Sequence, residues 1–150
     1  MSSTRLFALV YGVVFLLVGI LGFVPGVLTP VSPGEHAEHS VTVNAFEGYL
    51  FGLFHVNVLH SLVHVLFGIM GLAMSRTWGA ARSYARIVAV VYALLAVMGL
   101  IPGLNTVFGL IPIHGNDVWL HVLLAVPAAY LGFMAPPAAS DRVVATPPAV

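Results

Sequence analysis

The chain has 150 residues, of which 60% are hydrophobic and 7% are charged, and its formal net charge is zero. Soluble domains carry roughly 25% charged residues, so this composition excludes a soluble domain and indicates a protein of the lipid bilayer. The charge balance argues against nucleic acid as a partner, and the absence of cysteine excludes disulfides, thiolate metal sites and iron–sulfur clusters. Because each membrane-spanning helix needs about 20 residues, the length allows one compact bundle.

The first predicted span covers residues 6–24. It is a continuous apolar run behind Arg5, and the pair Pro25-Gly26 ends it. A signal peptide has a similar basic head and apolar core, but its core is shorter, and no small-residue cleavage site follows Val24. We therefore expect an uncleaved membrane span.

Residues 25–45 form the longest polar segment, which is expected to be an exposed loop. Its tract 35–39 reads Glu-His-Ala-Glu-His, which could bind a metal ion, although such a tract in a short loop is more often solvated. The second predicted span covers residues 46–74 and carries three histidines. Glu47 would lie in its first turn, where the helix dipole favours an acidic side chain.

The third predicted span covers residues 85–101 and ends before a Pro-Gly pair. The fourth covers residues 117–134 and contains a proline, which membrane helices often tolerate. These four spans would form a single domain, residues 1–135, and the tail 136–150 is predicted to be disordered.

The basic residues indicate the orientation of the chain. All of them are arginines, and they fall in the amino terminus, between the second and third spans, and in the tail. Four spans would put these regions on one side of the membrane, which the positive-inside rule makes cytoplasmic, together with both termini. The loops 25–45 and 102–116 contain no arginine and are expected to face outward. The five arginines are Arg5, Arg76, Arg82, Arg86 and Arg142.

The two halves of the chain are similar to each other. Residues 13–26 match residues 90–103, and residues 62–66 match residues 119–123. Two helical hairpins of the same topology would be related by an axis along the membrane normal. The predicted fold class is therefore all-α, a transmembrane four-helix bundle built from two similar helical hairpins. The equivalent polar residues are His60 with Asp117 and His64 with His121.

The polar residues of the second and fourth spans gather on one stripe of each helix, at about 100° per residue. At ~1.5 Å per residue, His60 and His121 lie at nearly the same depth, so the two stripes can face each other. The stripe of the second span contains Asn57, His60, His64, Gly68 and Gly71. The stripe of the fourth span contains Asp117, His121, Ala125, Ala128 and Gly132.

A metal site is the leading hypothesis for these residues. His60 and His64, one turn apart, can bind one ion, and His121 with Asp117 would complete a nitrogen and oxygen ligand set that suits zinc, iron or copper. A variant is haem held by His60 or His64 against His121, with the small residues of the stripes leaving room for it. The alternatives are hydrogen bonds that only hold the helices together, and binding of protons or a small ligand. The residues predicted to support the ligands from a second shell are Asn57, His114 and Asn116.

Two segments carry a resemblance to a known family. Residues 56–72, VNVLHSLVHVLFGIMGL, and residues 109–124, GLIPIHGNDVWLHVLL, resemble the signature segments of a family of small bacterial membrane proteins filed as domain of unknown function 4383. The resemblance covers roughly residues 5–135. It implies four spans and a place in the bacterial inner membrane, and it implies no activity.

The predicted function is a buried His/Asp site near the extracytoplasmic side, used for metal handling or electron transfer. No phosphate loop, nucleophile elbow, dinucleotide fingerprint or carboxylate pair occurs in the sequence, so no enzyme activity is predicted. The alternative is a non-catalytic accessory or scaffold protein that packs on a membrane partner or a second copy of itself. Its docking face would carry Gly48, Gly52 and His55, since small residues permit close helix contact. A proton path ranks last, because the inner half of the polar stripe is apolar.

Overall fold

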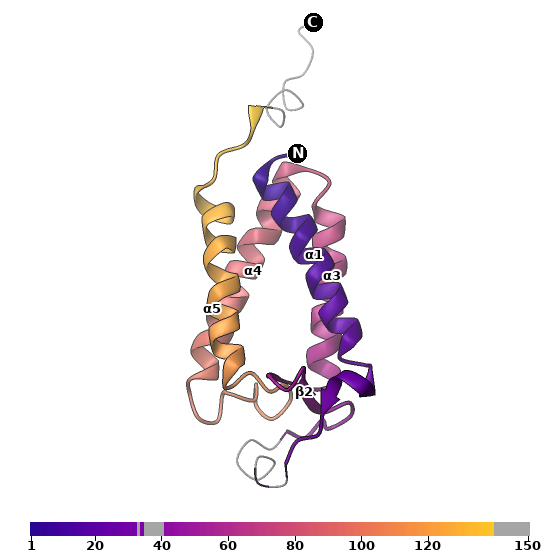
Figure 1. Cartoon of the computed structure of the whole chain (residues 1–150). Coiled ribbons are helices and arrows are strands. Elements are labelled where there is room, and N and C mark those ends of the chain that lie inside the picture. The colour runs from indigo at the N-terminus through magenta and orange to yellow at the C-terminus, as the bar shows by residue number, and fades with distance from the viewer. Residues whose placement is uncertain (33, 35–40, 140–150) are drawn as a thin grey trace, which may run out of the picture.

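The structure, a computed structural model, describes residues 1–32, 34 and 41–139. The chain is mostly helical in this part, as predicted, and four helices lie side by side in alternating directions (Figure 1). The amino terminus lies at the same end as the described carboxyl-terminal residues, and the small sheet lies at the other end (Figure 1). The helices are α1 (Ser3–Leu21), α3 (Val58–Met74), α4 (Trp78–Gly99) and α5 (Asn116–Ala129), which the π-helix η2 (Tyr130–Met134) continues.

The helix surfaces indicate a membrane protein. Helices α1, α4 and α5 with η2 are long and apolar enough to cross a bilayer, and α3 is apolar but has 17 residues. Large apolar side chains on these helices point outward: Leu17 is 56% exposed, Leu66 61% and Leu123 69%. A soluble protein rarely exposes such extended apolar surface, whereas lipid covers it at no cost.

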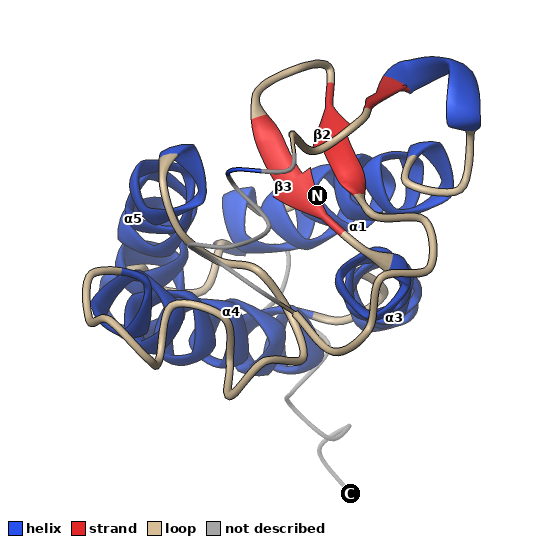
Figure 2. Cartoon of the chain, turned by 90° about the horizontal axis from the view of Figure 1, so that it is seen from below, coloured by secondary structure: helices blue, strands red, loops and turns tan. Residues whose placement is uncertain are grey.

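The prediction of one helix over residues 46–74 is wrong in its first part. Residues before α3 form a hairpin of β2 (Gly48–Leu50) and β3 (Phe54–Val56), and β1 (Leu28–Thr29), which follows the short 3-10 helix η1 (Pro25–Val27), pairs with β2 (Figure 2). All three strands are antiparallel.

Two glycines explain why this segment turns instead of continuing as a helix. Gly52 has φ +70°, a conformation that other residues rarely adopt, and it lies in the turn between the strands. A Cβ on Gly48 would lie 3.0 Å from the backbone oxygen of Thr29, so a larger residue would push β1 away by a few tenths of an ångström. Consequently Glu47 does not lie in a helical turn, and the helical docking face of Gly48, Gly52 and His55 does not exist.

Helix α4 begins at Trp78, earlier than the predicted start at residue 85. Thr77 caps it by accepting a hydrogen bond from the backbone N–H of Ala80, 3.3 Å away. Arg82 and Arg86 therefore lie inside the helix. Their Nε atoms donate to the backbone oxygen of Gly132 at 2.9 and 2.8 Å, which fixes the π-helix against α4.

The helices associate as two pairs, α1 with α3 and α4 with α5. The first pair is in close backbone contact, because a Cβ on Gly12 would lie 2.6 Å from the nitrogen of Leu72, and one on Gly68 would lie 2.5 Å from the nitrogen of Leu16. The two pairs meet through an aromatic core. Its buried rings are Phe7, Phe15, Phe67, Tyr84 and Tyr92.

Candidate metal centre

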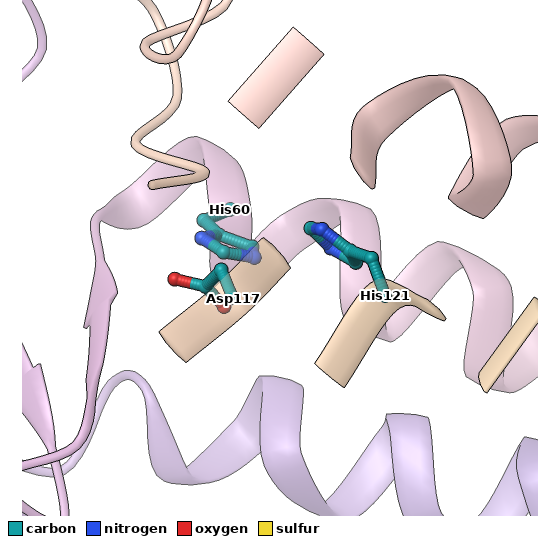
Figure 3. Close-up of side chains that lie close together, drawn as sticks. All are labelled: His60, Asp117 and His121. Atoms are coloured by element: carbon teal, nitrogen blue, oxygen red, sulfur yellow. The ribbon is translucent and has the colours of Figure 1, made fainter. Parts of the chain in front are cut away.

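Three ionisable side chains converge between α3 and α5, at the end of the helices that faces the sheet. His60 lies in the first turn of α3, Asp117 in the first turn of α5, and His121 one turn further along α5 (Figure 3). One ligand atom from each residue can be chosen so that all three lie within 4.8 Å of one another. The side chains are buried, with exposed fractions of 4%, 2% and 3%.

Asn57 fixes the position of His60. Its Oδ1 accepts a hydrogen bond from the backbone N–H of His60 at 2.9 Å, which caps the amino terminus of α3. Its Nδ2 donates to the backbone oxygens of Val43 at 2.8 Å and Leu110 at 2.7 Å. One fully buried amide therefore ties the start of α3 to two outer segments that are distant in sequence.

The spacing of Asp117 and His121 places both on the face of α5 that turns inward. Residues four apart lie one above the other on a helix. In α5 and η2 every residue of the predicted stripe is buried, and Val118 is buried as well. In α3 the stripe residues are also buried, together with Ser61 and Phe67. The predicted inward faces of both helices are confirmed by burial.

Several buried atoms of the cluster have no hydrogen-bond partner among the described residues. These atoms are His60 Nδ1, Asp117 Oδ2 and His121 Nδ1. Buried polar atoms are nearly always paired, and leaving one unpaired costs roughly 1–3 kcal/mol. Imidazole nitrogens and a carboxylate oxygen in one place form a donor set that suits zinc, iron or copper.

His64, the fourth predicted ligand, lies beside this group and is not part of it. Its ring stacks on that of His60, with centroids 4.8 Å apart and planes inclined by 19°. Its Nδ1 lies 3.1 Å from the backbone oxygen of His60. Because a carbonyl oxygen only accepts, His64 Nδ1 carries the hydrogen and donates it.

The residues predicted to support the ligands form contacts in the outer segments. Asn57 caps α3 as described, and Asn116 Nδ2 donates to the backbone oxygen of Leu53 at 3.1 Å, between the strands. His114 Nε2 lies 3.1 Å from His55 Nδ1. Through these contacts the three residues hold the sheet and the loop 100–115 over the site. The tract 35–39 lies outside the described residues.

Sequence reasoning missed a chain of three polar side chains, in which His55 and Glu47 are buried and His114 is half-buried. His55 Nε2 lies 2.9 Å from Glu47 Oε1, while its Nδ1 faces His114. The His55 and Glu47 side chains are 2% and 5% exposed. Because a carboxylate accepts, His55 Nε2 donates to Glu47, and in a neutral ring His55 Nδ1 then accepts from His114. The glycine-interrupted run of aromatic residues around His55 is a hairpin signal that would have taken both residues off the helix.

Two cavities border the cluster. One, of about 150 Å³, is lined by His60, His64, His121 and Tyr92 together with apolar side chains. The other, of about 90 Å³, is lined by His60, His64 and Asp117 with residues of the hairpin. Cofactor sites usually measure about 300–1,000 Å³, so neither cavity accommodates haem. The predicted room beside Gly68 and Gly71 is filled by α1.

A protein-family model described as "Domain of unknown function (DUF4383)" matches residues 5–134. The matched segment contains α3, α4, α5 and the three converging side chains. No match was found among curated proteins or among solved structures.

Proposed function

Since the chain belongs to the DUF4383 family, as its sequence predicted, and that family is described only as a domain of unknown function, we propose its function from its own residues. The protein is an integral membrane protein that binds one transition-metal ion between α3 and α5. The ligands are His60, Asp117 and His121. The observation that supports this is the convergence of one ligand atom from each of three buried side chains on two separate helices. Each of these side chains also carries a buried polar atom without a hydrogen-bond partner among the described residues.

Polar contacts that merely hold helices together would look different. Asn57 and Asn116 show that kind of contact, because their amides donate to backbone oxygens of other segments. Side chains that serve only as such contacts gain stability by pairing, typically about 0.6 kcal/mol for each contact in a membrane. The unpaired atoms of His60, Asp117 and His121 gain no stability in this way, whereas one ion would be bound by all three side chains. Ionisable residues within a membrane are functional sites by default.

The donor set favours a transition metal over magnesium or calcium. Mg²⁺ and Ca²⁺ prefer shells of six or more oxygens, whereas two imidazoles and one carboxylate suit Zn²⁺, Fe²⁺ or Cu²⁺. With zinc the site would serve metal handling, and with iron or copper it would serve electron transfer.

We place the site near the extracytoplasmic face of the bacterial inner membrane. Arg5 donates to the backbone oxygen of Ser75, and Arg82 and Arg86 donate to Gly132, so these arginines gather at the helix ends opposite the sheet. By the positive-inside rule that end is cytoplasmic, and both termini are with it. Helix α3 would act as a fourth, short span whose outer end the hairpin extends. The stacking of Phe15 on Tyr92, with centroids 5.4 Å apart, supports the proposed pairing of two similar hairpins, since these residues are equivalent in the repeat.

Metal analysis of protein purified in detergent without a chelator tests the proposal. We expect about one zinc, iron or copper ion per chain, or uptake of one with a rise in thermal stability. His60→Ala, Asp117→Asn and His121→Ala should each weaken binding by more than the roughly 10–100-fold that loss of an outer-shell partner costs. Trp119→Phe is the matched control, because Trp119 lies between two ligands on α5 yet is 70% exposed. Wild-type protein that binds none of these metals would refute the proposal.

A further inference from the structure

The larger cavity beside the cluster is lined by apolar side chains, by its histidines and by Tyr92. Its walls come from α3, α4, α5 and the loop 100–115, with Phe67, Leu95 and Ile113 among the apolar side chains. Asp117 does not line it. Its volume of about 150 Å³ matches that of an engineered apolar cavity that stays dry and binds benzene or xenon. A molecule that enters this space must therefore be small and uncharged.

Two of the three proposed ligands belong to the cavity wall. Because His60 and His121 line the cavity and also converge with Asp117, an ion held by all three would lie beside the cavity. Structural zinc sites use four protein ligands, whereas sites that react or exchange a ligand use three and keep one position open. Three protein ligands from the described residues, next to a cavity, correspond to the second kind.

His64 supplies a hydrogen-bonding group beside that open position. Its Nδ1–H is held by the backbone oxygen of His60, 3.1 Å away. In a neutral ring this leaves Nε2 as an acceptor. His64 lines both cavities, stacks on His60 and is 8% exposed, so it is buried next to the ligands without being one of them. An acceptor in this place stabilises a water molecule on the metal, since bound water donates hydrogen bonds.

We propose that the metal ion keeps one coordination position open toward the apolar cavity, where a small uncharged molecule of diatomic size displaces a metal-bound water that His64 holds. This inference rests on the proposed metal site and adds the ligand class that the site exchanges. His64 acts as a positioning residue. The exchange is reversible coordination, in which the water leaves intact and the neutral ligand takes its place.

Nitric oxide on the Fe²⁺-loaded full-length protein tests the open position, because its binding changes the visible and paramagnetic resonance spectra. We expect saturable binding at one site per iron. Leu95→Phe, which fills the cavity, should lower the affinity for nitric oxide at least tenfold without lowering the iron content. Leu94→Phe is the matched control, since Leu94 lies on the same helix but is 57% exposed.

His64→Leu and His64→Gln test the positioning role. Both variants should keep the wild-type iron content. His64→Leu removes the acceptor for bound water, so nitric oxide should bind at least threefold more tightly. His64→Gln keeps an acceptor oxygen, so its affinity for nitric oxide should lie closer to that of the wild type. A purely structural role for His64 would change iron content or stability instead, and that result would overturn its assignment.

Xenon provides a measurement that does not depend on the metal. The ¹²⁹Xe resonance should shift on addition of wild-type protein in micelles, and Leu95→Phe should abolish this shift relative to Leu94→Phe. Iron-loaded protein that binds neither nitric oxide nor xenon overturns the inference while leaving the metal site intact. A wild-type protein that takes up no metal refutes the proposed function itself, and the two failures are thus distinguished.

Discussion

Substitution of Asn57 gives the sharpest test of how the start of α3 is held. Its side chain makes three hydrogen bonds: Oδ1 accepts from His60, and Nδ2 donates to Val43 and Leu110. If Asn57 acted only as a helix cap, Asp would replace it without loss, because Asn and Asp are equally good at this position. The two donated bonds predict a different result.

The cost can be worked out bond by bond. Asn57→Ala loses a cap, which is worth about 1 kcal/mol. It also loses two hydrogen bonds, worth about 1 kcal/mol each, so the expected loss is about 3 kcal/mol. Asn57→Asp keeps the cap but sets a carboxyl oxygen against two carbonyl oxygens that were 2.7 and 2.8 Å from the amide nitrogen. Because that contact is repulsive, Asp should destabilise at least as much as Ala.

Unfolding in mixed micelles by titration with denaturing detergent measures these differences in free energy. Thr77→Ala is the control, since Thr77 caps α4 with an exposed side chain and should cost about 1 kcal/mol or less. Both Asn57 variants should also weaken metal binding, because His60 lies in the turn that Asn57 orders. If Asn57→Asp proves as stable as wild type, the two donated bonds contribute nothing and the reasoning is refuted.

Two further predictions concern the packing of α1 on α3 and the buried pair in the hairpin. Gly68→Ala puts a methyl group 2.5 Å from the backbone of Leu16 and should lower the free energy of unfolding by about 1–3 kcal/mol or more. In the control Gly26→Ala the methyl group has nothing within 4 Å, so the free energy of unfolding should stay within about 0.5 kcal/mol of wild type. Glu47→Leu removes the acceptor of His55 Nε2 and should cost about 1–3 kcal/mol, while Glu47→Gln, which restores an acceptor oxygen, should recover much of the loss. Equal stability of Glu47→Leu and wild type would show that the pair contributes nothing.

The inward faces of α3 and α5 were predictable because their pattern is strong. Small and ionisable residues recur every three or four positions among large apolar ones, and this period identifies the buried stripe whatever the surrounding solvent. Matching depth then brings His60 close to Asp117 and His121. The close contact of Gly12 with α3 was predictable for a similar reason, since small residues in a membrane helix mark a close neighbour.

The hairpin was missed because every residue from Phe46 to Val56 except Glu47 and His55 is apolar or glycine. Short apolar runs do not distinguish a strand from a helix by hydropathy alone. In a helix Gly48 and Gly52 would be contact residues, whereas in the structure Gly48 gives β1 room to approach and Gly52 forms a turn.

The exclusion of His64 from the converging group could not be read from its spacing. Two histidines four residues apart lie on one face of a helix. Whether both rings reach one point depends on the hydrogen bonds that their ring nitrogens form. Here the backbone oxygen of His60 takes the Nδ1–H of His64, and the ring stacks instead of converging. A hydrogen bond from a side chain to a nearby backbone carbonyl competes with binding of that side chain to a ligand, and the sequence pattern does not show which of the two forms.

The polar side chains around the site divide into two classes that a sequence treats alike. Asn57, Asn116 and the pair of Glu47 with His55 are bonded to other segments, so their contribution is already used in holding the sheet and the outer loop over the helix ends. Each unpaired atom of the cluster, in contrast, lowers the free energy of unfolding, and binding of a ligand to that atom would remove this cost. The metal site depends on the bonded side chains, because they hold the sheet and the outer loop over it. If these segments were loose, water would enter and form hydrogen bonds with the unpaired atoms, and no ion would be needed. Rigidity of the cover and affinity for the metal should therefore fall together when Asn57 is replaced.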